Sequence, residues 1–270
     1  MDAVTLGPAG TYSHRAASAV ADDVSFRESV TAIVEAVADG SFERGVVPIE
    51  NSIEGSVTET LDALADRKVA VVSEIVTPIR HALLAQSTEF ETVASHSQAL
   101  AQCRSYLESN YPAATQEAVA STARGVQYAR DDPSVAAIGH PSNATNGTEL
   151  EVLAEDIQDQ DSNATRFFLL APAAERSDAG GKTTLIVYPN VNYPGLLLEL
   201  LEAFADRNIN LSRVESRPSG NRLGDYLFHF DIDAGVYESR VQEALDDIEA
   251  IVEDGWVRNL GSYDTKHVLY

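Results

Sequence analysis

The sequence has one cysteine and no long apolar run, and these scarcities exclude several classes of protein. Cys103 has no second cysteine with which to form an internal disulfide, as expected of a chain in the reducing cytoplasm. The longest apolar stretches, such as Val69–Val72 and Leu196–Leu198, fall far short of the ~18 residues that a membrane-spanning helix needs. The N-terminus also lacks the basic start and apolar core of a signal peptide. A cytoplasmic protein with no membrane partner is predicted.

Lysines and runs of basic residues are also scarce. The chain has 19 Lys and Arg against 42 Asp and Glu, a formal charge of -23, and its only lysines are Lys68, Lys182 and Lys266. Nucleic acid and anionic lipid bind basic patches, so neither is expected as a partner. Acidic, lysine-poor surfaces are typical of proteins in concentrated salt, where screening removes self-repulsion. We therefore expect a halophilic protein whose stability rises with KCl concentration.

The length of 270 residues and the 44% hydrophobic content are sufficient for two packed domains. The stretch PAAERSDAGGK (172–182) is small, polar and glycine-rich, which predicts a linker. We expect a first domain over residues 1–172, a linker over 173–182 and a second domain over 183–270.

The first domain alternates β-rich runs with helical periodicity, as an α/β fold requires. Its predicted strands are Val4–Leu6, Gly45–Ile49, Val69–Val72, Val93–Ala94, Val135–Ile138 and Phe167–Leu170. Its predicted helices are Ser13–Val20, Val30–Ala38, Val57–Ala65, Ser97–Leu107 and Thr122–Ala129. The second domain has the order βαββαβ, which is the ferredoxin-like arrangement. Its elements are predicted at Thr183–Tyr188, Gly195–Asp206, Ile209–Ser216, Tyr226–Ile232, Glu238–Val252 and Trp256–Tyr263.

The turn Gly7–Ser13 lies between a predicted strand and a predicted helix. Glycines let the backbone approach a ligand, and a helix start with the hydroxyls of Thr11 and Ser13 favours an anion. The spacing is not that of a phosphate-binding loop. A plain helix cap explains the pattern equally well, so both interpretations stay open.

A polar segment follows the strand that ends near Ile49. Asn51 and Ser52 fall at the carboxyl end of this strand, where α/β folds bind ligands. Ser56 and Glu59 fit a capping box for the next helix and are interpreted as structural.

The segment SHSQALAQC (95–103) predicts a helix with two unlike faces. Gln98 and Gln102 share one face and can offer amides to a carboxylate or hydroxyl, while Cys103 falls on the buried face. Ser95 is expected to cap this helix, at least in part, with Gln98 closing the box. His96 could act as a general acid, but an ordinary hydrogen-bonding histidine is the commoner case.

The segment NATRF (163–167) opens an apolar strand with polar residues. Arg166 is one of few cations in an acidic chain, so it is the natural partner of a carboxylate. Thr165 by itself is unremarkable, because β-branched residues favour strands. The histidines lack metal-ligand spacing, so no metal is predicted.

These segments together resemble the prephenate dehydratase family. The matching pieces are GPAGTYSHRAA (7–17), VVPIENSIEGSVTETLD (46–62), SHSQALAQC (95–103) and NATRF (163–167). In the second domain, NYPGLLLELL (192–201) and ESRP (215–218) resemble a regulatory ACT domain that binds phenylalanine. Several motifs in the right order make this resemblance specific, although each one alone is weak.

The resemblance implies a catalytic domain of two lobes, like a periplasmic binding protein, with the substrate in the cleft. It implies conversion of prephenate to phenylpyruvate with loss of water and carbon dioxide, without a cofactor. Thr165 would be the catalytic residue, and Arg166 would pair with a substrate carboxylate. The residues expected to line the cleft or contact the substrate are Thr11, Ser13, Asn51, Ser52, Ser95, Gln98, Gln102, Arg166 and Phe167.

The resemblance also implies feedback regulation by L-phenylalanine, bound between two ACT domains of a homodimer or homotetramer. The residues that match this effector site are Asn192, Gly195, Leu196, Glu215, Ser216, Arg217 and Pro218. The family's usual Gly-Ala-Leu-Val is Gly-Leu-Leu-Leu here (195–198), which adds bulk near the effector.

Two other functions fit the same residues. A non-catalytic sensor of aromatic amino acids would keep both folds, but it would have no use for Thr165, Arg166 and Gln102 together. An arogenate dehydratase differs only in the amino group of its substrate. Because Met1 lies just before the first strand, no fused chorismate mutase is expected.

Overall fold

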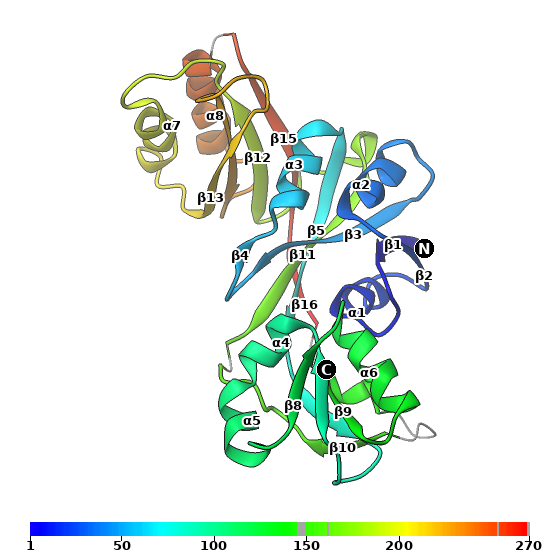
Figure 1. The fold of residues 1–270 in the computed structure, drawn as a ribbon. Helices are drawn as coiled ribbons and strands as arrows, with labels where there is room; N and C mark the ends of the chain where they lie inside the picture. Colours follow the sequence, from blue (N-terminus) through cyan, green and yellow to red (C-terminus); the bar gives the residue numbers. More distant parts are fainter. Residues whose placement is uncertain (145–149, 161, 253, 269–270) are drawn as a thin grey trace.

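A computed structural model describes residues 1–144, 150–160, 162–252 and 254–268. The chain forms three units, each built on one β-sheet (Figure 1). Two of them are the lobes of the first domain, and the third is the second domain. Within the described residues, no helix is long and apolar enough to cross a membrane.

The first lobe is a seven-stranded mixed sheet in the order β16-β5-β11-β3-β1-β2, with β4 paired to β3. Its strands are β1 (Asp2–Leu6), β2 (Asp23–Arg27), β3 (Arg44–Asn51), β4 (Gly55–Ser56), β5 (Val69–Pro78), β11 (Ala164–Pro172) and β16 (Thr265–His267). Its helices are α1 (Tyr12–Ser18), α2 (Val30–Ala38) and α3 (Thr58–Asp66). The β-branched side chains of β3 pack against α2 and α3, which places buried Val47 and Ile49 in the main core.

The second lobe is a five-stranded sheet in the order β10-β6-β9-β7-β8. Its strands are β6 (Ala82–Ala85), β7 (Thr92–Ser95), β8 (Thr115–Ala118), β9 (Val135–Gly139) and β10 (Glu151–Ala154). Its helices are α4 (Ser97–Gln102), α5 (Arg104–Asn110) and α6 (Thr122–Asp131), with a short 3-10 turn, η1 (Pro141–Asn143). The chain enters this lobe after β5 and returns to the first lobe at β11, so two crossover segments join the lobes.

The second domain is an antiparallel sheet in the order β13-β14-β12-β15. Its strands are β12 (Lys182–Tyr188), β13 (Leu211–Pro218), β14 (Tyr226–Ile232) and β15 (Trp256–Tyr263). Helices α7 (Leu196–Ala205) and α8 (Ser239–Val252) pack on one face around Leu200, Phe204, Phe230 and Ile248. This βαββαβ fold confirms the predicted ferredoxin-like arrangement.

The opposite face of that sheet packs on the first lobe. Ile186, Leu227 and Tyr263 belong to the same buried cluster as residues of α2 and α3. Arg258 donates to the carbonyl oxygens of Leu64 and Ala65 at the end of α3, at 3.2 and 2.8 Å. The second domain therefore shares a core with the first lobe.

The domain boundaries differ from the expectation at the end of the chain. After β15 the chain leaves the second domain, and β16 pairs in parallel with β5 of the first lobe. Residues 183–270 therefore do not all belong to the second domain. The expected linker is shorter too, because η2 (Ala173–Glu175) follows β11 directly and β12 begins at Lys182.

Two local predictions are wrong. The helix expected over 97–107 is interrupted at Cys103, which ends α4 and precedes α5, although Cys103 is buried as predicted. The capping box at the start of α3 does not form. The Ser56 hydroxyl donates to the Glu215 carboxylate at 3.0 Å, and Glu59 instead accepts from the backbone N–H of Thr31 at 3.0 Å.

Candidate active site between the lobes

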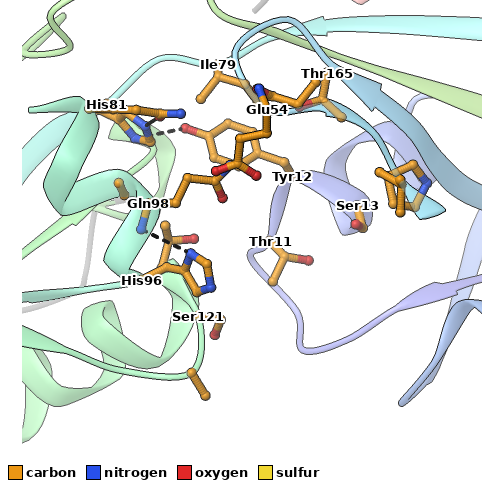
Figure 2. A pocket seen from close by; sticks show the side chains of 17 residues that line it. Thr11, Tyr12, Ser13, Glu54, Ile79, His81, His96, Gln98, Ser121 and Thr165 are labelled. Atoms are coloured by element: carbon orange, nitrogen blue, oxygen red, sulfur yellow. Dashed lines mark hydrogen bonds between the residues drawn. The ribbon is translucent and has the colours of Figure 1, made fainter. Parts of the chain in front are cut away.

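A cavity of about 280 Å³ lies between the two lobes (Figure 2). The first lobe contributes residues from α1, β3 and β11, and the second lobe contributes residues from α4 and the turn before α6. The lining residues are Thr11, Tyr12, Ser13, Pro48, Asn51, Glu54, Val57, Ile79, His81, His96, Gln98, Ala99, Gln102, Ala120, Ser121, Thr122 and Thr165. The described lining includes no Lys or Arg.

Four helices begin at this cavity. Their N-cap residues Thr11 (α1), Val57 (α3), His96 (α4) and Ser121 (α6) all line it. The N-terminus of a helix carries unpaired N–H groups and the positive end of the helix dipole. The cavity is therefore a favourable place for an anion although the whole chain carries a charge of -23.

Thr165 is held at the cavity by the polar end of the neighbouring strand. In the antiparallel pairing of β11 with β3, Thr165 lies opposite Asn51, and the ladder shifts register directly after Arg166. The Asn51 Nδ2 donates to the Thr165 Oγ1 at 3.0 Å. Because the Thr165 oxygen already accepts this bond, its own O–H is the remaining donor and can be directed at a bound molecule.

The amide of Asn51 has a fixed orientation. Its Oδ1 accepts from the backbone N–H groups of Ile53 and Glu54 at 2.9 and 3.2 Å, so its Nδ2 must face Thr165 and Asn163. Asn163 Oδ1 accepts from that Nδ2 at 3.2 Å. The loop after β3 thus determines which atom Asn51 presents to its neighbours.

A second polar group comes from α4. Gln98 and Gln102 both line the cavity, as their helical spacing predicts. The Gln102 Oε1 accepts from Asn163 Nδ2 at 2.9 Å and lies 2.8 Å from His81 Nε2. His81 is almost fully buried, and burial lowers its pKa, although the bond to Gln102 acts in the opposite direction.

The structure brings six of the predicted substrate-site residues together at the cavity. These are Thr11, Ser13, Asn51, Gln98, Gln102 and Thr165. Thr11 also caps α1 by accepting from the His14 N–H at 3.3 Å, so the cap and the site are the same residue. The two interpretations of the first turn, a ligand site and a helix cap, are therefore compatible.

Three of the predicted residues do not line the cavity. The Ser52 hydroxyl donates to the Ser162 carbonyl oxygen at 3.1 Å and so connects the loop after β3 to the segment before β11. Ser95 is fully buried and donates to the Ile138 carbonyl oxygen at 2.8 Å, so it does not cap α4, and His96 does. Phe167 is buried in the core of the first lobe.

Arg166 has a different partner from the expected one. Its guanidinium contacts the fully buried carboxylate of Asp231 on β14 and lies 3.4 Å from Glu74 on β5. Burial acts to lower the pKa of Arg166, but the two carboxylates raise it overall. The expectation that Arg166 faces the substrate is therefore corrected, because it connects β11 to the second domain.

The lining residues that sequence reasoning missed lie mainly on the connections between elements. Ile79 and His81 lie on the first crossover. Asn163 lies on the second crossover and does not line this cavity, but its Nδ2 donates to Gln102. The two crossovers touch, since the Ile79 N–H donates to the Asn163 carbonyl oxygen at 2.8 Å. Tyr12 belongs to the segment GPAGTYSHRAA (7–17), but no sequence pattern marks it as a site residue.

In the described part of the chain, no group of three or more His, Cys, Asp or Glu is arranged to hold a metal ion. Cys103 lies in the core of the second lobe, where burial raises the pKa of its thiol to about 12. It is therefore a core residue, as its place on the helix predicts.

A second hollow, of about 460 Å³, lies at the start of α7. Asn192, Gly195 and Leu196 line it together with Leu198, which is 60% exposed. Gly195 takes φ +100°, a left-handed conformation that glycine adopts without strain, and it is the N-cap of α7.

The ESRP segment does not line this hollow. Glu215 accepts from Ser56, and Arg217 makes two hydrogen bonds of 2.9 Å to the Asp62 carboxylate on α3. Ser216 and Pro218 on the same strand are exposed. In a single chain, the predicted effector residues therefore divide between an apolar hollow and a contact with the first lobe.

Comparison with known proteins assigns a family to each of the two parts of the chain. The prephenate dehydratase family matches residues 3–175, and the ACT domain family matches residues 185–250. A prephenate dehydratase of Lactococcus lactis subsp. lactis is 36% identical over 269 residues, which cover 96% of this chain and 95% of the relative. A bifunctional chorismate mutase/prephenate dehydratase of Aquifex aeolicus is also 36% identical, with 96% of this chain and 72% of the relative covered.

Solved structures agree. The crystal structure of a prephenate dehydratase from Arthrobacter aurescens in complex with L-Phe has a TM-score of 0.88 at 36% identity, covering 98% of this chain and 90% of that one. A quorum-quenching acylase, GqqA, has a TM-score of 0.85 at 22% identity and shares the fold. These matches, which cover both the two-lobed domain and the ferredoxin-like domain, place this chain in the prephenate dehydratase family, with an ACT domain at its C-terminal side.

Proposed function

We propose that the chain converts prephenate to phenylpyruvate, with loss of water and carbon dioxide, in the cavity between the lobes. The observation that carries the proposal is the Thr165 hydroxyl, whose oxygen accepts from Asn51 and whose proton is therefore available to a leaving group. Family membership supports the reaction, and the geometry supports Thr165 as the hydrogen-bond donor.

The reaction needs little from the protein beyond position and hydrogen-bond donors. The bond from the ring to its carboxylate breaks, its electrons form the aromatic ring, and the 4-hydroxyl departs with a proton as water. Carbon dioxide and phenylpyruvate remain, so one proton is taken up and no oxidant or reductant is required. A donor aimed at the departing oxygen stabilises the charge that develops there. Thr165 would be that donor, directly or through a water molecule.

The two substrate carboxylates would be held without a cationic side chain. Helices α3 and α6, of nine and ten residues, begin at the cavity with Val57 and Ser121 as N-caps. The amides of Gln98 and Gln102 add side-chain donors. Backbone N–H groups and neutral amides bind anions without the desolvation cost of an extra charge.

The first experiment follows the formation of phenylpyruvate from prephenate by the full chain. Replacing Thr165 with valine keeps the shape and removes the hydroxyl, and turnover should fall by about 10²–10³-fold, the usual cost of a lost transition-state donor. Thr165→Ser should keep most of the activity.

Thr77→Val is the matched control. Thr77 pairs with Thr165 across the β5–β11 ladder and is fully buried, and its hydroxyl has no hydrogen-bond partner among the described residues. It does not line the cavity, so Thr77→Val should keep wild-type turnover. Wild-type turnover in Thr165→Val would exclude Thr165 from the mechanism. If the wild-type chain forms no phenylpyruvate, the alternative function of a non-catalytic sensor of aromatic amino acids is favoured.

Arogenate is a second candidate substrate. Glu54 places the one carboxylate of the described lining at the cavity, and a carboxylate can pair with the ammonium group by which arogenate differs from prephenate. The comparison is of kcat/KM for both substrates with wild type and Glu54→Gln. If Glu54→Gln lowers kcat/KM for arogenate alone, Glu54 recognises the amino group.

L-Phenylalanine is the effector that the ACT domain and the L-Phe complex of the Arthrobacter aurescens relative support. We propose that it binds at the hollow of Asn192, Gly195 and Leu196, closed by a second copy of the chain in a homodimer or homotetramer. Light scattering with and without phenylalanine tests the assembly. A monomer that still responds to phenylalanine would exclude the shared site. We also propose that the protein is located in the cytoplasm.

A further inference from the structure

His81 lies where the chain crosses from the first lobe to the second, just before β6. Its side chain lines the cavity, although only 2% of the residue is exposed. Its backbone is fixed on both sides: its N–H donates to Gln158 Oε1 at 2.9 Å, and its carbonyl oxygen accepts from the Ile157 N–H at 3.0 Å. The imidazole is therefore held in one place at the junction of the lobes.

The direction of each hydrogen bond in this region can be traced from two backbone groups. The N–H groups of Ile53 and Glu54 donate to Asn51 Oδ1, so Asn51 must donate through Nδ2 to Asn163 Oδ1. Asn163 must then donate through its own Nδ2 to Gln102 Oε1. A carbonyl oxygen only accepts.

The same reasoning fixes the tautomer of His81. Since Gln102 Oε1 accepts, the His81 nitrogen 2.8 Å away from it must carry a proton, and this nitrogen is Nε2. The other nitrogen, Nδ1, lies 3.4 Å from the Tyr12 hydroxyl, which itself donates to the Arg80 carbonyl oxygen at 2.6 Å (Figure 2). Because burial lowers the pKa of His81, the ring is neutral near pH 7, and its single proton is the one that Nε2 donates to Gln102.

We propose that His81 is a positioning residue for the reaction: together with Asn163, it occupies both acceptor directions of Gln102 Oε1 and so presents the Gln102 amide N–H groups to the substrate. Gln102 lines the cavity and also an adjoining cavity of about 230 Å³, so a reversed amide would present an oxygen to a bound anion. The proposal rests on the proposed function, because the consequence of a reversed amide is measured on prephenate.

The test is a double-mutant cycle between His81 and Gln102. His81→Leu should lower kcat/KM for prephenate about 10–100-fold, since one substrate donor is replaced by an acceptor or left mobile. His81→Gln, whose Nε2 reaches about as far as that of histidine, should recover most of this loss. In a Gln102→Leu background, His81→Leu should have little further effect, because no amide remains to be oriented.

His140→Leu is the control for a purely structural role. The ring of His140 packs edge-on against the ring of Tyr12, with 6.1 Å between centroids, and the rings of His81 and Tyr12 are the same distance apart. His140 does not line the cavity. His140→Leu should lower kcat/KM by the same factor in the wild-type and Gln102→Leu backgrounds. If His81→Leu also acts equally in both backgrounds, or if His81→Gln recovers nothing, the positioning role is overturned.

A spectroscopic measurement tests the tautomer without activity. In protein labelled with 15N-histidine, the ring of His81 should show a protonated Nε2 and an unprotonated Nδ1 at neutral pH. A protonated Nδ1 would overturn the inference even if prephenate is turned over. A protein with the expected tautomer and no turnover would instead contradict the proposed function and leave the orientation of Gln102 standing.

Discussion

Replacing Asp231 with asparagine removes one buried charge and changes little else in shape. The Asp231 carboxylate is fully buried and accepts from Arg213 Nε and Nη2 at 2.8 and 3.1 Å and from the Thr184 hydroxyl at 2.8 Å. It also contacts Arg166 on β11 of the first lobe. Burial acts to raise the pKa of Asp231, but the two guanidinium groups lower it overall, so the group is ionised.

The magnitude follows from what Asp231→Asn leaves behind. Two guanidinium groups would stay buried around a neutral amide, and breaking a buried ion pair from one side costs about 3–5 kcal/mol. For a chain of this length that lowers the melting temperature by about 6–20 °C, at about 2–4 °C per kcal/mol. Because Arg166 is adjacent to Thr165, turnover of prephenate should fall as well.

Asp62→Asn is the control across the same interface. Asp62 receives two hydrogen bonds of 2.9 Å from Arg217, but its side chain is 49% exposed, and an exposed pair contributes about 0–1 kcal/mol. Urea denaturation and thermal melting of wild type and both variants give the comparison. Two results would refute the view that the contacts of Asp231 with Arg166 and Arg213 hold the domains together. One is a fall of less than about 1 kcal/mol in the free energy of unfolding of Asp231→Asn, and the other is a fall of the same size in both variants.

Three further predictions follow from the site and the charges. Burial and the charge of Arg213 lower the pKa of His229 to about 3, so between pH 6.5 and 3 the unfolded chain binds a proton at this residue and the folded chain does not. The free energy of unfolding should therefore fall as the pH drops from 6.5 toward 3. His229→Leu should flatten this part of the stability curve, measured by urea denaturation. Asn51→Leu removes the donor to Thr165 and should lower kcat on prephenate by about 10–100-fold without unfolding the protein, which steady-state kinetics and circular dichroism can check. With a formal charge of -23, the melting temperature should rise steeply between about 0.1 M and several molar KCl, and a flat series would contradict the expectation of a halophilic protein.

The sequence predicted the elements that form the cores of the units. Apolar runs such as Gly45–Ile49 and Phe167–Leu170 became the buried strands β3 and β11, because a strand covered on both faces must be apolar throughout. The predicted strands of the first domain did not include the edge strands β2, β8, β10 and β16, nor the short inner strand β6, whereas the edge strands β13 and β15 of the second domain were predicted. The edge strand β8 (Thr115–Ala118) is exposed along its whole length, so no hydrophobic alternation marks it.

The site was predictable where its residues belong to one local segment. Gln98 and Gln102 share a face because helical spacing requires it, and Asn51 lies at the end of an apolar strand. His81 was not predictable, since its role depends on a contact with Gln102 that only the crossover of the lobes creates. A single sequence also cannot tell which carboxylate Arg166 meets, and its partner Asp231 is 65 positions away.

The return of the chain to the first lobe limits how the second domain can move. The polypeptide enters that domain from β11 and leaves it into β16, and both strands lie beside β5 in one sheet. A body tethered at two neighbouring points cannot swing away freely on one hinge; it can only tilt about the line through the tethers. Effector binding would then reach the catalytic sheet as a twist applied on either side of β5, and not as the docking and release of a loose domain.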